Sequence, residues 1–546
     1  MVVKNKLIGV VLIVLSVIAV LALVHSGLPI THDGQDHVAR IASFYQNLTD
    51  GNIIPRWAAN LNWGYGHPIL EFLYPLPSYI ASIFHSIGFS LVDSVKVVEG
   101  LGMILSLFFM FFWLKQFLGR EAALLGAFLY TYAPYRFVDL YVRGDIGENL
   151  AFAFVPLVLY FVFKLYKKPE LKYSLLGAFS LAFLILAHNA IALITVPFIG
   201  VYALILVYHS KNRKPLLISL SSLLIFGFTL SAFFWAPALL EGKYTLRNIV
   251  TKGDYLDSFV NFKALIYGPW SYGGSGVFTQ QLGIVQWLAL ILSPAIAVML
   301  WFKKDKNYLL VVACLLYTLL AIFLMLPISN FLWARIMMLQ NFQFPWRFLA
   351  ITVLGASALA ALAIYSLPKK LRLACVLVLI VLVLFFEKDY LKAKAYSYQS
   401  ANFYTGVYQG TTDTGESSPL WSVRFMEHFP KAHLDMLDGK ATIKEIKRTS
   451  TDHQYAVTVE KRTLFEENTL YFPGWEIKAN NIPVAVQFQN MQYRGTMLFF
   501  LDKGNYTIEA KYSETRLRLI SDIISSISLI VLLGLFIFRF VKMRLS

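Results

Sequence analysis

The chain has 546 residues, of which 57% are hydrophobic, 16% aromatic and only 15% charged. These proportions and a mean hydropathy of +0.59 exclude a soluble protein and indicate one that crosses a membrane many times. The net charge of +16 could suggest a nucleic-acid partner. However, the basic residues lie in short clusters between apolar runs, where they set orientation and meet anionic head groups. We therefore expect membrane lipids, and no nucleic acid, among the partners.

The first apolar run, Leu7 to His25, follows Lys4 and Lys6 and is long enough to cross a hydrocarbon core of about 30 Å. A cleaved signal peptide is the alternative, because basic residues precede the run and small residues follow it. The run is longer than a typical signal-peptide core, and its removal would detach the following loop from its anchor. We therefore interpret it as a retained first span.

A dense group of ionisable residues, Thr31 to Arg40, follows this span directly. Apolar residues then recur at helical spacing, so residues 36–48 are predicted to form an amphipathic helix along the membrane interface. Aspartates at such a place can simply cap the helix. A carboxylate near an apolar surface, however, has a raised pKa, and its ionised form can accept the proton of a hydroxyl. Asp33 and Asp36 are therefore the candidate catalytic residues.

The same segment could also hold a metal ion. Asp33 and Asp36 together with His32 and His37 could bind a divalent cation, Mg or Mn, that neutralises a phosphate leaving group. The spacing does not require one, and a histidine satisfied at the surface is the alternative. The metal ligands stay undetermined at this point.

Eleven further apolar runs bring the expected number of spans to about twelve. They cover residues 100–117, 122–135, 150–166, 173–187, 190–208, 215–234, 282–302, 308–326, 348–367, 371–386 and 519–541. With the N-terminus in the cytoplasm, every lysine-rich hairpin falls inside, as the positive-inside rule requires. We expect a cytoplasmic-membrane protein with both termini inside and five larger loops outside: residues 26–99, 134–149, 237–281, 327–347 and 387–518.

The outer loops carry arginine where the inner ones mostly carry lysine. A guanidinium binds phosphate oxygens in pairs, so several of these arginines could cradle a lipid phosphate. Snorkelling, or salt bridges to Asp139, Asp145 or Glu148, is the alternative. The arginines are Arg40, Arg56, Arg136, Arg143, Arg247, Arg335 and Arg347.

Aromatic and polar side chains alternate in three outer segments, residues 55–68, 141–148 and 342–348. Such composition suits sugar rings and equally suits an interfacial aromatic belt. We predict that the three segments form one pocket, and that the polar pair His188 and Asn189, at the outer end of a span, faces the bundle interior. The candidate substrate- and phosphate-binding residues are His37, Arg56, Trp57, Arg143, Glu148, His188 and Arg347.

The last outer segment changes character. Alternating runs such as residues 455–460 and 505–512, with turn residues between them, predict antiparallel strands in a small β-sandwich-like domain. We therefore divide the chain into a transmembrane domain with the catalytic first outer loop (1–386), an extracytoplasmic β-rich domain (387–518), and a last span with a cytoplasmic tail (519–546). Cys314 and Cys375 both lie in expected spans, so cysteine usage does not fix the redox compartment.

Several short motifs resemble a known superfamily. A first span, an Asp-x-x-Asp-His loop and an amphipathic outer helix before a many-span bundle are similar to the class C (GT-C) membrane glycosyltransferases. The resemblance is closer to the prokaryotic membrane proteins labelled "6-pyruvoyl-tetrahydropterin synthase-related", through residues 32–37, 55–57, 62–66, 143–148, 188–189 and 344–348. Residues 471–475 and 503–506 resemble the C-terminal β-domain of the YfhO-type membrane proteins.

The resemblance implies a mainly α, GT-C-like fold and a specific kind of reaction. It implies transfer of a sugar from a polyprenyl-phosphate-linked donor to a glycan, lipid or protein acceptor on the outer face. Asp33 or Asp36 would fill the position of the family's catalytic acidic residue. This chain has Gln35-Asp36 where many relatives have two adjacent acidic residues, which puts metal use in doubt. A flippase for lipid-linked glycans and a non-catalytic scaffold for cell-surface polymers are the alternatives.

Overall fold

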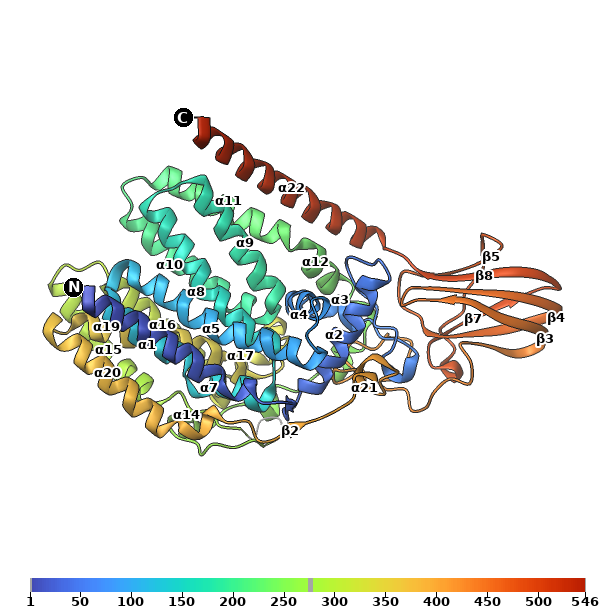
Figure 1. The fold of residues 1–546 in the computed structure, drawn as a ribbon, viewed down its shortest axis with the longest axis horizontal. Coiled ribbons are helices and arrows are strands. Elements are labelled where there is room, and N and C mark those ends of the chain that lie inside the picture. Colours follow the sequence, from blue (N-terminus) through green and yellow to red (C-terminus); the bar gives the residue numbers. More distant parts are fainter. Residues whose placement is uncertain (1, 274–277, 546) are drawn as a thin grey trace.

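The computed structural model describes the backbone of residues 2–273 and 278–545 and the side chains of residues 6–273 and 278–537. A helical bundle forms one end of the molecule and a β-sheet the other, with loops and short helices between them (Figure 1). Both chain ends lie at the bundle end, away from the sheet. The basic residues expected inside near the two ends, Lys4 and residues 539–544, lie outside the described side chains.

The bundle is built from apolar helices that match the predicted spans. They are α1 (Val2–Val20), α5 (Leu91–Leu118), α6 (Arg120–Thr131), α8 (Ile146–Lys167), α9 (Leu171–Ala187), α10 (Asn189–His209), α11 (Arg213–Leu230), α15 (Ile284–Phe302), α16 (Tyr308–Met325), α19 (Leu349–Ser366), α20 (Lys369–Phe386) and α22 (Arg516–Leu545). Within the described residues, nine stretches are long and apolar enough to cross a membrane. The other three predicted spans are α6 with 12 residues, α9 with 17, and α20, which has three basic residues in its first turn.

Shorter helices lie in the loops between these spans. They are α2 (Gly34–Thr49), α3 (Ile69–Phe72), α4 (Leu76–Ser86), α7 (Pro134–Val138), α12 (Ala232–Leu240), α13 (Arg247–Val250), α14 (Phe262–Ile266), α17 (Asn330–Trp333), α18 (Met337–Gln340) and α21 (Ala401–Thr405). The predicted interfacial helix is α2, whose apolar residues are buried and which packs against α4 and α5.

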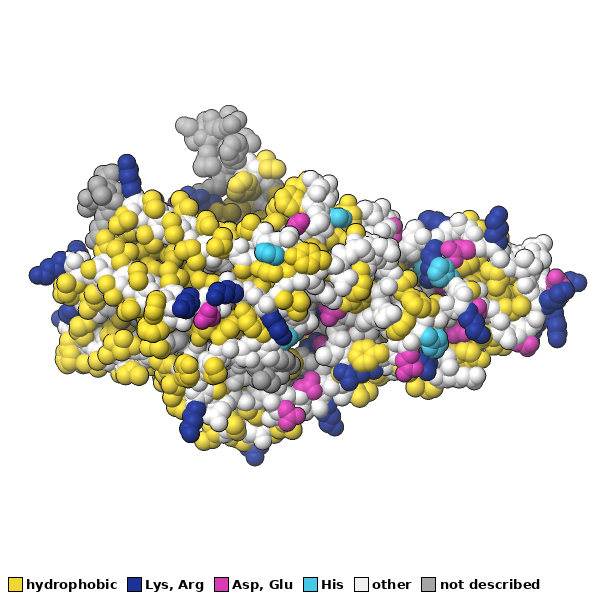
Figure 2. Space-filling model, turned by 60° about the horizontal axis from the view of Figure 1, so that its bottom comes forward, with side chains coloured by type: hydrophobic (Ala, Val, Ile, Leu, Met, Phe, Trp, Pro, Cys, Tyr) yellow, Lys and Arg dark blue, Asp and Glu magenta, His cyan; other side chains and the backbone are white. Residues whose placement is uncertain are grey.

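The surface of the bundle is apolar. Large hydrophobic side chains stay exposed along α1, α11, α15, α20 and α22, as in helices that face lipid tails. Hydrophobic atoms accordingly dominate the helical part in Figure 2, whereas charged side chains crowd the β-rich end. The predicted mainly helical, many-span fold with a C-terminal β-domain is thus confirmed.

The strands of the β-domain form one connected antiparallel sheet. Its order is β3-β4-β8-β5-β6, and β7 pairs with the second half of β4, beyond the stretch that pairs with β8. The strands are β3 (Leu434–Arg448), β4 (Asp452–Leu470), β5 (Trp475–Ala479), β6 (Ile482–Pro483), β7 (Thr496–Leu501) and β8 (Gly504–Tyr512). The expected sandwich therefore takes the form of a single sheet. Alternate residues of β4, such as Tyr455, Val457 and Val459, face its core.

Residues 395–413, which we call the strap, run back along the first outer loop before the sheet begins. The two-residue strands β1 (Leu28–Pro29) and β2 (Tyr396–Ser397) pair with each other. Further along, the backbone N–H groups of Asn62 and Trp63 donate to carbonyl groups of Gly410 and Tyr408. The first outer loop is therefore held against a segment more than 300 residues later in the chain.

Candidate active site

Arg143 lies at the centre of a buried ionic group, which we call the Arg143 cluster (Asp139, Arg143, Asp145 and Glu148). Its guanidinium nitrogens lie 2.6 Å from Asp139 Oδ1, 2.8 Å from Asp145 Oδ2 and 2.9 Å from Glu148 Oε2. The guanidinium also lies over the Trp346 ring, 4.7 Å from its centroid. The salt bridges left open as an alternative for this arginine are therefore present.

Three carboxyl groups share one guanidinium here, so they do not all carry charge equally. Burial, reinforced by the neighbouring Glu148, raises the pKa of Asp139 well above its usual range. Burial would also raise the pKa of Asp145, but Arg143 and His188 outweigh it and hold this pKa well below the usual range. Asp145 is therefore a stable anion beside Arg143, and Asp139 is the member that keeps a proton.

Asp33 is brought to this cluster by backbone hydrogen bonds. The N–H groups of His32 and Asp33 donate to the carbonyls of Val142 and Arg143, each at 2.9 Å. Gly144 permits this approach, because its φ is +71° and a Cβ there would lie 2.2 Å from the hydroxyl oxygen of Thr31. The loop between α7 and α8 and the first outer loop therefore meet along their backbones.

The carboxylate of Asp33 is half-buried and has no hydrogen-bond donor among the described residues. It stands at the N-cap position of α2 but makes no capping bond; the Thr31 hydroxyl accepts from Gly34 instead. Burial, and then repulsion from Asp145, raise the pKa of Asp33, while Arg40 and Arg143 lower it in part. A free carboxylate with a raised pKa is suited to accept a proton.

Asp36 and His37 have other partners. Asp36 accepts a hydrogen bond of 2.8 Å from the Tyr408 hydroxyl of the strap. His37 is buried, and its Nδ1 lies 3.2 Å from an Arg40 nitrogen. Burial and the nearby Arg40 hold the pKa of His37 well below its usual range, so this imidazole is neutral. Arg40 also donates to the Thr412 carbonyl, which ties α2 to the strap a second time.

His188 joins the cluster from another span, as predicted for a polar residue facing the bundle interior. It is the N-cap of α10, where its Nδ1 accepts from the Ile191 N–H. Its Nε2 lies 3.7 Å from Asp145 Oδ2. Tyr74 closes this side, because its hydroxyl donates to Asp145 at 2.8 Å and its ring lies 4.8 Å from that of His188.

Arg347 approaches the cluster from the start of α19 and retains donor capacity. Its Nε lies 3.7 Å from Glu148 Oε2 and has no hydrogen-bond partner among the described residues. Another of its nitrogens donates to the Phe342 carbonyl at 3.0 Å. The side chain is 12% exposed, so the guanidinium reaches the cluster without being fully enclosed.

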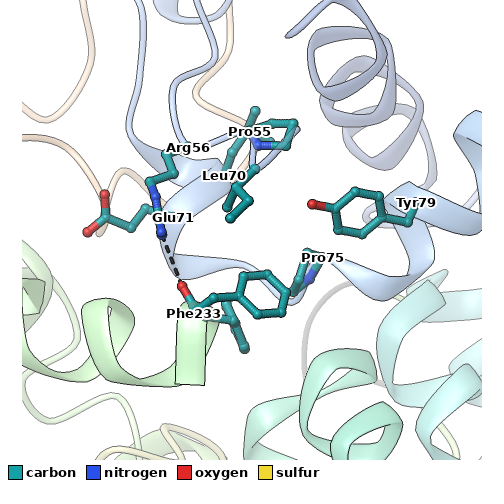
Figure 3. Close-up of a pocket in the computed structure, with 9 residues that line it drawn as sticks. Pro55, Arg56, Leu70, Glu71, Pro75, Tyr79 and Phe233 are labelled. Atoms are coloured by element: carbon teal, nitrogen blue, oxygen red, sulfur yellow. Dashed lines mark hydrogen bonds between the residues drawn. The ribbon is translucent and has the colours of Figure 1, made fainter. Parts of the chain in front are cut away.

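Arg56 and Trp57 are not brought to this group. Arg56 bonds Glu514 and Asp522 at 3.1 and 2.6 Å. It also donates to the Phe233 carbonyl, the bond drawn in Figure 3. The cavity beside it measures about 10 Å³, which is room for a single water. Trp57 is fully buried against Trp475 of the β-domain. Of the three outer segments, residues 141–148 and 342–348 therefore meet, whereas these two side chains connect the first outer loop to the β-domain and last span.

The described residues contain one group that could hold a metal ion, and it is not the predicted one. Ligand atoms of Asp145, Glu148 and His188 lie within 4.8 Å of one another. Arg143 already donates to both carboxylates, and a cation placed there would be repelled by the guanidinium. The set therefore fits a resident Mg or Mn ion poorly. His32 does not join it, because its Nε2 bonds the Gly273 carbonyl.

Three tyrosines of the site carried no sequence signal that distinguished them. Tyr135 donates to Glu148 at 2.6 Å, and Tyr74 and Tyr408 hold Asp145 and Asp36. Tyrosine at the outer ends of spans is expected in any membrane protein. Their roles depend on contacts between distant segments, which spacing along one chain does not encode.

Comparison with known proteins agrees with this architecture. Residues 67–235 match the family model described as dolichyl-phosphate-mannose-protein mannosyltransferase. This stretch includes Arg143, Glu148 and His188 but not Asp33 or Arg347. Over this stretch the chain resembles a family of membrane glycosyltransferases, and the predicted resemblance to the GT-C superfamily is confirmed.

Three individual proteins are similar to parts of this chain. A protein of Lactococcus lactis subsp. cremoris is 30% identical over 311 residues, which make up 54% of this chain and 50% of that protein. The chain thus matches about half the length of this relative. Mycobacterial arabinofuranosyltransferase AftD is similar over 71% of this chain and 27% of its own, with 14% identity and a TM-score of 0.45. The apo oligosaccharyltransferase of Archaeoglobus fulgidus is similar over 76% of this chain and 61% of its own, with 13% identity and a TM-score of 0.44.

Proposed function

We propose that this protein transfers a sugar from a polyprenyl-phosphate-linked donor to an acceptor hydroxyl at the extracytoplasmic face, with Asp33 as general base. The observation that carries the proposal is the carboxylate of Asp33, which is half-buried, free of hydrogen bonds, and held beside the Arg143 cluster by backbone contacts. Asp36, the other candidate, already accepts from Tyr408.

The reaction would move one proton and exchange one bond. The acceptor hydroxyl gives its proton to Asp33 as its oxygen bonds the sugar carbon, and the bond from that carbon to the phosphate oxygen breaks. The electron pair leaves with the lipid phosphate. Arg347 offsets this growing charge, because its Nε has a hydrogen to donate.

Arg143 would act differently from the phosphate ligand that the sequence suggested. Its guanidinium is occupied by three carboxyl groups, of which Asp139 keeps a proton, so Arg143 holds the cluster together. On the same side of the site, His37 is neutral. The Nδ1 of His188 accepts a hydrogen bond from the Ile191 N–H. We place the donor phosphate near Arg347 and the acceptor near Asp33.

Asparagine at position 33 separates the enzyme from the alternatives. Purified protein in lipid is given labelled polyprenyl-phosphate sugars and a mixture of acceptors, and transfer is compared among wild type, Asp33→Asn and Asp36→Asn. Because a positioned base contributes about 10²–10⁴-fold, Asp33→Asn should lose that factor in kcat while its unfolding temperature is unchanged. The exposed Asp389→Asn is the matched control and should keep full transfer.

The other outcomes are equally informative. Equal transfer by Asp33→Asn and wild type would reject Asp33 as the base. Movement of the donor across the bilayer without transfer would favour the flippase, and neither activity would favour the scaffold. Because Arg143 occupies the one group of metal-type ligands in the described structure, EDTA should leave transfer unchanged.

A further inference from the structure

A basic pocket lies at the end of the bundle opposite to the Arg143 cluster. Glu148 lies in the first turn of helix α8. At 1.5 Å per residue, the 22 residues of this helix span about 33 Å and end at Lys167. There, side chains from three separate connections surround a cavity of about 250 Å³. This is room for several waters, or for a phosphate group with part of an attached head group.

The lining of this pocket is cationic. Lys167 ends α8, Lys211 lies between α10 and α11, and Lys306 lies between α15 and α16. None of the three forms an ion pair with a carboxylate in the described structure, and no described Asp or Glu lines the cavity. The positive-inside rule requires basic residues on this side but not that they converge, since convergence adds mutual repulsion. An anion would remove that repulsion.

Two further features of the pocket lining favour the binding of an anion. His209 lines the cavity, and its Nε2 is buried without a hydrogen-bond partner among the described residues. Asn212 lines it as the N-cap of α11, an 18-residue helix, yet makes no capping bond with its side chain. The first N–H groups of that helix and its dipole favour negative charge at this position. Ser210 adds a hydroxyl.

We propose that this pocket binds a phosphate group through Lys167, Lys211, Lys306 and His209. An anionic phospholipid head group and free inorganic phosphate both offer this chemistry. The pocket is separate from the proposed reaction, so it stands whether or not the protein transfers sugars.

The test counts bound phosphatidylglycerol on the full-length protein. Wild type in phosphatidylcholine nanodiscs is titrated with fluorescent phosphatidylglycerol, and the triple variant Lys167→Gln, Lys211→Gln, Lys306→Gln is compared with it. Lys168→Gln, Lys214→Gln, Lys304→Gln is the matched control, because it removes the same charge from the same connections but from residues that do not line the cavity. Each lining lysine should contribute about fivefold in affinity, and the control triple less than twofold in all.

The outcomes decide both the site and its ligand. Equal weakening by the two triples would overturn the proposal, because attraction would then follow total charge alone. If the lining triple does not fold, the single variants must each show the fivefold loss with an unchanged unfolding temperature. Displacement of phosphatidylglycerol by millimolar inorganic phosphate would assign the site to phosphate from either source; retention of the lipid would assign it to the head group. His209→Phe should weaken binding in both cases, and its failure to do so would remove His209 from the site.

Discussion

Arg143 gathers three carboxyl groups around a single buried guanidinium. Removing one partner of such a group leaves uncompensated buried charge, which costs more than the pair itself contributes. The planar fork also matters, because a lysine ammonium does not reach several carboxylates with paired donors. Arg143 is therefore the residue at which a single change should most disturb the site.

We predict that Arg143→Ala lowers the free energy of unfolding by about 3–5 kcal/mol, because Asp139, Asp145 and Glu148 lose their shared cation. Arg143→Lys should recover only part of this loss. Thermal and denaturant unfolding of the purified protein measure the change. Arg335→Ala, a change at an exposed side chain, is the control and should stay within about 0.5 kcal/mol of wild type. Equal stability of Arg143→Ala and wild type would contradict the cluster.

The raised pKa of Asp33 gives the proposed reaction a pH dependence. Only the ionised carboxylate accepts a proton, so the rate should fall tenfold per unit as the pH drops below this pKa. Because burial and Asp145 raise the pKa, the acid limb should lie above 3.8, the ordinary value for aspartate. Single-turnover rates from about pH 3 to 8 measure this limb. It should persist in Asp36→Asn; a wild-type limb at or below 3.8 would refute the assignment.

At the scale of elements, a buried pair of carboxyl groups connects the first outer loop to the last span. Arg518 at the start of α22 lies 2.8 Å from Glu71 and 2.6 Å from Glu241. Burial raises the pKa of Glu71 to about 8, with Glu241 adding to the effect, while Arg518 opposes it. Burial would raise the pKa of Glu241 too, but its hydrogen bond with Glu71 and the charge of Arg518 lower it. Glu71 therefore holds a proton at neutral pH and Glu241 pairs with Arg518.

This arrangement predicts a falling stability with rising pH. Between about 4.5 and 8 the folded protein keeps the Glu71 proton that the unfolded chain loses, so the contribution is complete at low pH and is lost as the pH rises through 8. Unfolding temperatures at pH 5 to 8 measure the slope. Glu71→Gln should flatten it, because the amide does not titrate, and the exposed Glu476→Gln should keep the wild-type slope. An unchanged slope in Glu71→Gln would place the proton elsewhere.

The strap should loosen when its bond to α2 is removed. Tyr408→Phe removes the hydroxyl that donates a hydrogen bond to Asp36, which should lower the stability of this contact by about 1 kcal/mol. Local opening of residues 395–413 should then become about fivefold more frequent, as measured by hydrogen exchange. Tyr398→Phe is the control within the strap, because this exposed hydroxyl makes only a 3.5 Å contact with Ser26. Equal exchange in the two variants would show that Asp36 does not hold the strap.

At the scale of the molecule, both chain ends lie away from the sheet, in keeping with an even number of crossings (Figure 1). We predict that an impermeant maleimide labels Asp502→Cys from outside intact cells and Lys168→Cys only after permeabilisation. Asp502 is 84% exposed on the β-domain, and Lys168 follows the C-terminal end of α8. Both variants are made in a chain without Cys314 and Cys375. The reverse labelling pattern would invert the proposed orientation.

The helices could be predicted because apolar length is a local property: every expected span corresponds to a helix of the structure. The meeting of residues 141–148 with 342–348 was also predictable, because both hold polar groups at the outer ends of spans. The contacts of Arg56 could not be predicted, because its partners Glu514 and Asp522 lie more than 450 residues away in the chain. Likewise, nothing in the spacing of Asp33 and Asp36 shows that Tyr408 engages one of them and leaves the other free.

The strap has a consequence for the order of events during synthesis. Asp36 and Tyr408 are separated by 372 residues. At a synthesis rate of 5–20 residues per second, the strap is therefore made about 20–70 s after the loop that carries Asp33. During that interval the loop can already form its backbone bonds with Val142 and Arg143, but Asp36 still lacks its partner Tyr408. The proposed site is thus completed last, after nearly all the membrane helices have been made, because the strap is synthesised after them.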